Sequence, residues 1–273
     1  MIRVSSDDGS EVAAYDFGGE GRPLLLGHAT GFHAHMWLPV VRELRGRFRC
    51  YAWDARGHGA SGTPASGDFD WRRSGDDARA VAGAFGLDRP LGAGHSAGAS
   101  ALVLAEGEHP WTFAAVWLYE PVVPDWSAMG GENPLVAGAL RRRDRFALRE
   151  DARQRLAAKP PFDTFTPEAL DLYVAYGLVD DPEGGLRLAC RPVDEARTYE
   201  GGMTADPRRA LPQVGVDAVV VAGSGRSDAR PPDLEGATAL LPRGRLELLE
   251  GLTHFGPFER PDLVAASIVR ALG

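Results

Sequence analysis

The sequence predicts an α/β fold in which helices flank a mostly parallel central sheet. Short apolar segments bounded by Gly, Pro or Asp alternate with longer helical patterns, and strands buried on both faces of a sheet read as such continuous apolar runs. The predicted strands are residues 23–26, 48–53, 91–94, 114–119, 216–221 and 245–249. The predicted helices of the core are residues 76–85, 97–106 and 261–272.

Residues 122–211 interrupt this alternation. The stretch is rich in Arg, Glu, Pro and Ala, and only residues 186–190 within it look extended. Its helical patterns cover residues 135–146, 152–158 and 167–176. We therefore predict a core made of residues 1–121 and 212–273, and an inserted helical cap of residues 122–211 that covers a pocket at one end of the sheet.

Charge and hydropathy exclude two classes of partner. The formal net charge is -8 and no Lys/Arg-rich run is interleaved with aromatic residues, so we expect no nucleic-acid partner. The densest basic stretch, residues 141–145, is broken by Asp144 and is interpreted as a solvated helix face. No apolar segment approaches the ~18–20 residues that span a bilayer, so we expect no membrane association.

The N-terminus and the cysteines indicate a cytoplasmic protein. The first residues do not show a basic region followed by an apolar one, so we expect no signal peptide. Cys50 lies in an apolar segment, and two cysteines, Cys50 and Cys190, do not make a disulfide framework. We expect both to be reduced thiols.

A serine in a Gly-x-Ser-x-Gly pattern is the candidate nucleophile. Residues 94–98 read Gly-His-Ser-Ala-Gly, with an apolar strand before them and an Ala-rich helix after them. A serine on a strained strand-to-helix turn needs small neighbours so that the backbones can approach, and the helix N-terminus then directs its N–H groups at the reaction centre. The alternative is that Ser96 only caps the helix; the flanking strand and helix favour the nucleophile.

A serine hydroxyl needs a base, and the base needs a carboxylate to orient it. His254 follows the last apolar strand and precedes the final helix, where a loop histidine at the sheet edge can reach Ser96. Asp228 is the first choice for the acid because it lies on the loop after the strand at 216–221, where the end of that strand would present it. The chain order Ser, Asp, His also supports His254 as the base. Glu120, which ends the strand at 114–119, is the alternative acid.

Two backbone N–H groups are needed to hold an oxyanion. Ala97, the residue after the nucleophile, supplies one, and Thr30 is the candidate for the other because Gly31 lets that loop turn sharply; Ala29 is the adjacent alternative. The histidines next to glycines at strand ends and the aromatic residues beside the catalytic loops are predicted to contact substrate. The candidates are His28, His95, Phe32, Phe255 and Trp126, with Trp37, Phe162, Phe165, Tyr173 and Tyr176 as further lining residues.

The remaining polar residues do not indicate a metal or a cofactor. No His-x-x-x-His, Cys-x-x-Cys or phosphate-binding Gly-rich loop occurs. His28, His33 and His35 lie on one predicted loop without carboxylate partners, and His58 is interpreted as holding a turn. Asp54 ends a strand and is assigned to turn support.

These motifs, in this order, resemble the α/β-hydrolase superfamily over nearly the whole chain outside the insertion. Residues 28–31 are similar to its oxyanion loop, which usually begins His-Gly, so Ala29 departs from the common pattern. Residues 54–61 are similar to its turn after the next strand, and residues 94–98 to its nucleophile elbow. The resemblance implies the α/β-hydrolase fold with a helical cap, Asp228 as acid and His254 as base, although some relatives keep the acid at the position of Glu120.

Ser96 indicates the reaction class within that superfamily. Dehalogenases and epoxide hydrolases on this scaffold use an aspartate at the elbow, whereas a serine favours acyl transfer. We predict a serine hydrolase that cleaves a small or medium hydrophobic ester, thioester or lactone through an acyl-enzyme. Two alternatives stay open: a non-hydrolytic enzyme (lyase, cofactor-free oxygenase or natural-product cyclase) with the same residues, and a ligand-binding receptor on the same fold.

Overall fold

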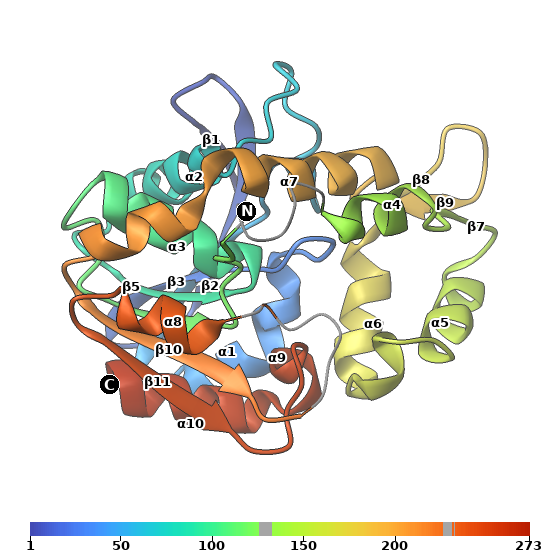
Figure 1. Cartoon of the computed structure of the whole chain (residues 1–273). Coiled ribbons are helices and arrows are strands. Elements are labelled where there is room, and N and C mark those ends of the chain that lie inside the picture. The colour runs from blue at the N-terminus through green and yellow to red at the C-terminus, as the bar shows by residue number, and fades with distance from the viewer. Residues whose placement is uncertain (126–132, 226–230, 232) are drawn as a thin grey trace.

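An eight-stranded sheet forms the centre of the molecule (Figure 1). The computed structural model describes residues 1–125, 133–225, 231 and 233–273. The strands of the sheet, in chain order, are β1 (Ile2–Ser5), β2 (Glu11–Gly18), β3 (Arg22–Gly27), β4 (Phe48–Trp53), β5 (Leu91–His95), β6 (Ala115–Tyr119), β10 (Asp217–Gly223) and β11 (Gly244–Leu249). Their spatial order is β1-β2-β4-β3-β5-β6-β10-β11.

The sheet is parallel from β4 to β11 and antiparallel at the β1–β2 edge. The predicted fold class is therefore confirmed, and the structure adds β1 and β2, which the sequence analysis did not identify. Half of the residues in β2 are buried and β1 is mostly exposed, so neither strand reads as a continuous apolar run.

Helices cover both faces of the sheet because side chains along each strand alternate between the two faces. Leu25 packs on one face with α2 (Trp71–Ala84), α3 (Ala97–Glu108) and α8 (Leu234–Ala239). Leu24 and Leu26 pack on the other face with α1 (Leu38–Leu44) and α10 (Pro261–Leu272). Two short helices complete the core: η1 (Ala34–Trp37) lies between β3 and α1, and α9 (Gly256–Glu259) lies between β11 and α10. Burial on both sides explains why Leu24, Leu25 and Leu26 occur in one run.

The chain between β6 and β10, which we call the insertion, has its own elements at one side of the sheet (Figure 1). They are α4 (Pro134–Leu140), β7 (Arg145–Phe146), α5 (Arg149–Ala157), η3 (Phe162–Thr164), α6 (Pro167–Tyr176), β8 (Leu178–Asp180), β9 (Leu186–Leu188), α7 (Pro192–Ala205) and η4 (Pro207–Gln213). In its described residues the strands form a separate antiparallel sheet, β7-β9-β8, where the sequence predicted a single extended segment. The helix α7 was not predicted.

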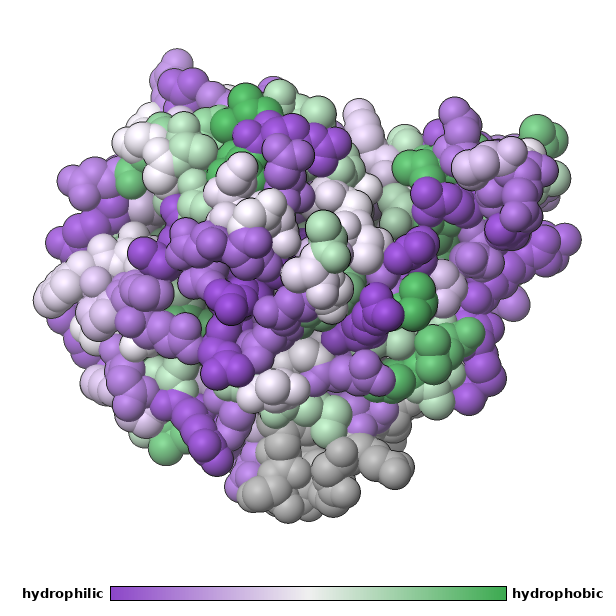
Figure 2. Space-filling view, turned by 90° about the horizontal axis from the view of Figure 1, so that it is seen from above, coloured by the Kyte–Doolittle hydropathy of each residue, from purple (hydrophilic) through white to green (hydrophobic). Residues whose placement is uncertain are grey.

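Besides the apolar residues packed on the two faces of the sheet, a separate apolar cluster joins the insertion to the core. Phe32 and Met36 from the segment after β3, and Phe258 from α9, pack with Phe162 and Tyr173 of the insertion. The outer surface is different: in the view of Figure 2, hydrophilic residues cover most of the face and hydrophobic ones form separate patches. The insertion is therefore attached by buried aromatic contact.

Among the described residues, no helix combines the length and the apolarity that a bilayer crossing requires. Cys50 and Cys190 are both free and buried. Burial raises the pKa of the Cys50 thiol to about 12 and that of the Cys190 thiol well above its usual value, so both stay as neutral thiols.

Candidate active site

Ser96 lies on a strained turn between β5 and α3. Its backbone has φ 54° and ψ −119°, a conformation that non-glycine residues rarely adopt. The flanking glycines permit the turn: a Cβ on Gly94 would lie 2.4 Å from the Ala99 Cα, and one on Gly98 would lie 2.3 Å from the Gly27 carbonyl carbon. The small residues of the pattern are thus required by backbone packing.

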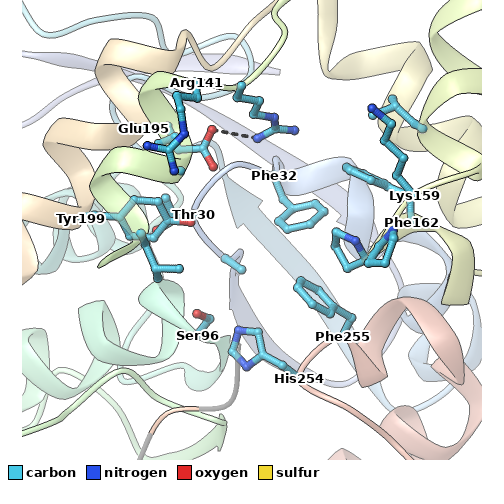
Figure 3. A pocket seen from close by; sticks show the side chains of 18 of the residues that line it. Thr30, Phe32, Ser96, Arg141, Lys159, Phe162, Glu195, Tyr199, His254 and Phe255 are labelled. Atoms are coloured by element: carbon cyan, nitrogen blue, oxygen red, sulfur yellow. Dashed lines mark hydrogen bonds and ion pairs between the residues drawn. The ribbon is translucent and has the colours of Figure 1, made fainter. Parts of the chain in front are cut away.

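The side chain of Ser96 faces a cavity and does not cap the helix. Within the described part of the chain, no side-chain hydrogen bond from Ser96 caps α3. Ser96 and His254 both line one cavity of about 1240 Å³, and Figure 3 shows the hydroxyl beside the imidazole at one end of it. The alternative reading of Ser96 as a simple helix cap is therefore not supported.

A buried carboxylate holds the His254 ring. Glu120, which is fully buried, accepts a hydrogen bond at Oε2 from His254 Nδ1 at 2.8 Å. Its Oε1 accepts one from the Gly223 N–H at 3.0 Å. Glu120 also has a positive φ, 42°, so strained residues end both β5 and β6. Asp228, the first choice from the sequence, lies outside the described residues.

The loop that carries His254 is fixed by hydrogen bonds from neighbouring strands. The Tyr119 hydroxyl donates to the Thr253 carbonyl at 2.6 Å, and His95 Nε2 donates to the His254 carbonyl at 2.8 Å. Burial, reinforced by the adjacent His254, holds the pKa of His95 well below its ordinary value, so that ring is neutral. The rings of His95 and His254 are 5.0 Å apart.

His95 and His28 were predicted to contact substrate, and the structure places them elsewhere. Neither is among the described residues that line the cavity. His95 is fully buried behind His254, and His28 uses both ring nitrogens on backbone groups: Nδ1 donates to the Ala29 carbonyl and Nε2 accepts from the Ala55 N–H. Both histidines support the loops around the site, so we correct the expectation of substrate contact.

The loop after β3 lies against the first turn of α3. A Cβ on Gly98 would also lie 2.6 Å from the His28 carbonyl oxygen, so the backbones are in close approach where Ala97 and Thr30 were predicted to supply N–H groups. Ala29 and Thr30 both line the cavity. The Thr30 hydroxyl is buried and has no hydrogen-bond partner among the described residues.

His58 and Asp54 hold this loop in place. His58 Nδ1 donates to the Arg56 carbonyl, and its Nε2 accepts the Gly31 N–H at 2.9 Å, next to Thr30. Burial lowers the pKa of His58 to about 4, which keeps the ring in the neutral form that can accept. Asp54 accepts hydrogen bonds from the Ala34 and Ala60 N–H groups and from the Tyr15 hydroxyl, consistent with support of the turns.

The cavity walls contain some of the predicted aromatic residues and others that the sequence analysis missed. Phe32, Phe162 and Phe255 line the cavity, whereas Trp37, Phe165, Tyr173 and Tyr176 are not among its described lining residues; Trp126 lies outside the described residues. The additional lining aromatics are Trp71, Phe146 and Tyr199. Tyr199 and the lining residue Glu195 are four apart on α7, a spacing that would have placed both on one helix face had the helix been predicted.

The basic stretch at residues 141–145 also differs from its interpretation. Arg141, Arg142 and Arg143 follow α4 and line the cavity, as do Arg155 of α5 and Lys159. Arg142 donates to Glu195 Oε2 at 2.8 Å and to the Tyr173 hydroxyl. These arginines therefore lie beyond the end of the helix and contribute to the wall of the cavity, where Arg141 and Arg143 are also exposed to solvent.

The α/β-hydrolase fold has two features that this structure also has. One is a strand–turn–helix that places a strained serine at the edge of a mostly parallel sheet, and the other is a histidine on the loop after the last strand of that sheet. Residues 24–267 match the alpha/beta hydrolase family, and the chain belongs to that family.

Three solved structures are similar over almost the whole chain. An E-2-(acetamidomethylene)succinate hydrolase is 21% identical, with 99% of this chain and 98% of that chain covered and a TM-score of 0.84. An esterase from Thermogutta terrifontis with malate bound is 20% identical, with 98% and 96% covered and a TM-score of 0.73. An enol-lactonase from Burkholderia xenovorans LB400 is 21% identical, with 99% of each chain covered and a TM-score of 0.72. At these identities the likeness extends to the fold alone.

Proposed function

We propose that the protein is a serine hydrolase that cleaves a small or medium hydrophobic ester, thioester or lactone through an acyl-enzyme. The observation that carries the proposal is the buried hydrogen bond between Glu120 and His254 Nδ1, which leaves His254 Nε2 to act on the neighbouring Ser96. A carboxylate that fixes the tautomer and stabilises the imidazolium is what a histidine base needs. The names of the similar structures, a hydrolase, an esterase and an enol-lactonase, agree with this class.

In the proposed mechanism, His254 Nε2 removes the Ser96 proton while Ser96 Oγ attacks the substrate carbonyl carbon. The N–H groups of Ala97 and Thr30 donate to the oxyanion, and each such donor is worth about 3–4 kcal/mol of transition-state stabilisation. His254 then gives the proton to the leaving oxygen or sulfur. Water, deprotonated by His254, attacks the acyl-enzyme and releases the acid.

Glu120 is proposed as the acid of this site, in place of the first choice Asp228. Its two carboxylate oxygens accept from His254 and from the Gly223 N–H, so the ring and the carboxylate are held from both sides. Residues 122–211 are proposed to act as the cap, because they supply the cavity wall that faces Ser96.

A fluorophosphonate probe and a series of p-nitrophenyl esters and lactones of increasing chain length test the proposal. The parent should be labelled at Ser96 and should turn over at least part of the series, and Ser96→Ala should lose labelling and about 10⁶ of kcat while keeping its melting temperature. Equal turnover by Ser96→Ala would overturn the assignment. Labelling at Ser96 without hydrolysis of any compound would instead support the non-hydrolytic alternative.

A further inference from the structure

The cavity is positively charged, although the chain as a whole is acidic. The chain has a formal net charge of -8. Among the described residues that line the cavity, five are cationic and two are acidic, a surplus of three positive charges. The cations are Arg141, Arg142, Arg143, Arg155 and Lys159, and the acids are Asp151 and Glu195. Lys159 is the single lysine of the sequence. A cavity lined by one sign of charge concentrates ligands of the opposite sign.

Among the described residues, four of these cations lack an acidic partner, and three of the four have no side-chain partner of any kind. Arg142 pairs with Glu195, and Arg143 donates to the Arg145 carbonyl and lies over the Phe146 ring. Arg141, Arg155 and Lys159 form no ion pair or side-chain hydrogen bond with the residues that the structure describes.

Two arginines of α5, Arg153 and Arg155, differ in whether they have an acidic partner. Arg153 on α5 is not among the lining residues and pairs with Asp171, whereas Arg155 on the same helix lines the cavity without a partner. An arginine in the last turn also interacts favourably with the helix dipole, which explains Arg155 alone. The dipole does not explain why Arg141 and Lys159, from other segments, line the same cavity.

The cations lie away from the catalytic residues. In Figure 3, Arg141 and Lys159 are at the end of the cavity opposite Ser96 and His254, and Phe32, Phe162 and Phe255 lie between the two ends. A ligand that extends through the cavity therefore meets a nucleophile at one end, aromatic rings along its length and positive charge at the other end.

We propose that the insertion end of the cavity binds a negatively charged group of the substrate, a carboxylate or a phosphate, remote from the bond that is cleaved. This inference rests on the proposed hydrolase function and names the substrate class: an acyl compound with an apolar middle and an anionic end. Arginine presents paired N–H donors that match carboxylate and phosphate oxygens, and lysine adds a mobile point charge. The anion supplies the partner that Arg141, Arg155 and Lys159 lack within the described protein.

Matched pairs of esters test the proposal. The p-nitrophenyl monoesters of glutaric, adipic and suberic acid are compared with the same compounds capped as methyl esters, which have nearly the same length but no charge. The parent should prefer the anionic member of the best pair by about tenfold in kcat/KM, mainly through KM, because several partly exposed cations each contribute modestly. The preference should fall as salt is raised.

The variant Arg141→Gln/Arg155→Gln/Lys159→Gln removes the unpaired charges, and its ratio of anionic to capped kcat/KM should fall to near one. Arg153→Gln is the matched control, since it removes a charge from the same helix outside the cavity, and it should leave the ratio as in the parent. Circular dichroism and the melting temperature check that each variant is folded. An ω-phosphono analogue of the best monoester, assayed in parallel, distinguishes phosphate from carboxylate recognition.

Binding to Ser96→Ala provides a second measurement that does not need turnover. The anionic esters should raise its melting temperature more than the capped esters do, and the triple variant in the same background should lose that difference. A ratio near one in the parent, or a preference that survives the triple variant, would overturn the inference while labelling and turnover at Ser96 still support a hydrolase. Turnover that survives Ser96→Ala would overturn the hydrolase proposal itself.

Discussion

The sheet edge and the insertion form opposite walls of one cavity, and the two walls are built differently. At the sheet edge, strained backbone at Ser96 and Glu120 and buried neutral histidines fix each group through hydrogen bonds to main-chain atoms. At the insertion, the lining includes long charged side chains beside its aromatic and aliphatic residues, and Arg141, Arg143, Arg155 and Lys159 among them are exposed.

We infer from this difference that the sheet edge holds the groups that react, whereas the insertion determines which substrate is preferred. Groups that take part in bond making must be held within fractions of an ångström, which rigid strand ends and packed loops provide. Long side chains on an inserted segment can change length and charge without disturbing that geometry. We therefore expect substitutions at the sheet edge to change kcat and those in the insertion to change which substrate is preferred.

After the loss expected for Ser96→Ala, the largest effect is expected from Glu120→Gln. The amide keeps the size of the side chain but no longer carries the charge that stabilises the His254 imidazolium, and it favours the wrong tautomer of the ring. We expect kcat on a neutral p-nitrophenyl ester to fall by about 10²–10⁴, measured under saturating substrate.

Asp228→Asn is the matched control for this comparison of acids. If Glu120 is the acid, Asp228→Asn keeps kcat within a few-fold of the parent, whereas Glu120→Gln does not. The reverse pattern, with Asp228→Asn inactive and Glu120→Gln active, would return the role to Asp228 and would contradict our proposal.

Gly98→Ala should damage the sheet edge through backbone contact alone. The new Cβ would lie 2.3 Å from the Gly27 carbonyl carbon and 2.6 Å from the His28 carbonyl oxygen, so α3 must move away from the loop that carries Thr30. Displacement of one oxyanion donor lowers kcat by about 10²–10³. Kinetics and the melting temperature should both show the loss.

Gly83→Ala distinguishes this contact from a general effect of alanine on a helix. Gly83 is in α2, and a Cβ there would meet nothing within 4 Å. The change should leave kcat as in the parent and stabilise the protein by about 0.5–1 kcal/mol. If Gly98→Ala behaves in the same way, the close approach of α3 to the loop is not needed for activity.

The sheet edge was largely predictable because its constraints are local in the sequence. The strained turn at Ser96 requires small residues at fixed offsets, so residues 94–98 contain the pattern whatever the rest of the chain does. Strands β4 and β6 read as apolar runs because both faces are covered. Which carboxylate reaches His254 depends on how β6 and β10 align in space, and the sequence alone left both candidates open.

The insertion was less predictable because its residues act through contacts between distant segments. The sequence of residues 141–145 is typical of a solvated helix face. The ion pair between Arg142 and Glu195 forms only because α4 packs against α7. The short strands β7, β8 and β9 have two or three residues each, too few to show alternation.

Low pH should reduce the stability of the folded protein, because the buried histidines at the sheet edge are neutral in the folded state. The folded protein holds the pKa of His58 at about 4, below its ordinary 6.5, so on acidification the unfolded chain takes up a proton that the folded chain does not. Stability is then lost as pH falls, by about 2 kcal/mol between pH 7.5 and pH 5 for this residue. Urea unfolding at both pH values measures the change.

His58→Gln tests the assignment, because a glutamine oxygen can accept the Gly31 N–H but does not titrate. The variant should show a smaller loss of stability between the two pH values than the parent, whatever its stability at pH 7.5. Identical pH dependence of the two proteins would mean that another group, such as His33 with its pKa lowered to about 3 by burial, is responsible.

The smallest expected effect lies where the two regions meet at the surface. Arg42 of α1 donates to both carboxylate oxygens of Glu168 on α6, at 2.8 and 2.9 Å, and the side chains are 56% and 46% exposed. Water screens such a pair, so a double-mutant cycle with Arg42→Ala and Glu168→Ala should give a coupling of about 0.2–1 kcal/mol in unfolding free energy. A larger coupling would mean that a surface ion pair, rather than the buried aromatic contact around Phe32, fixes the insertion over the sheet edge.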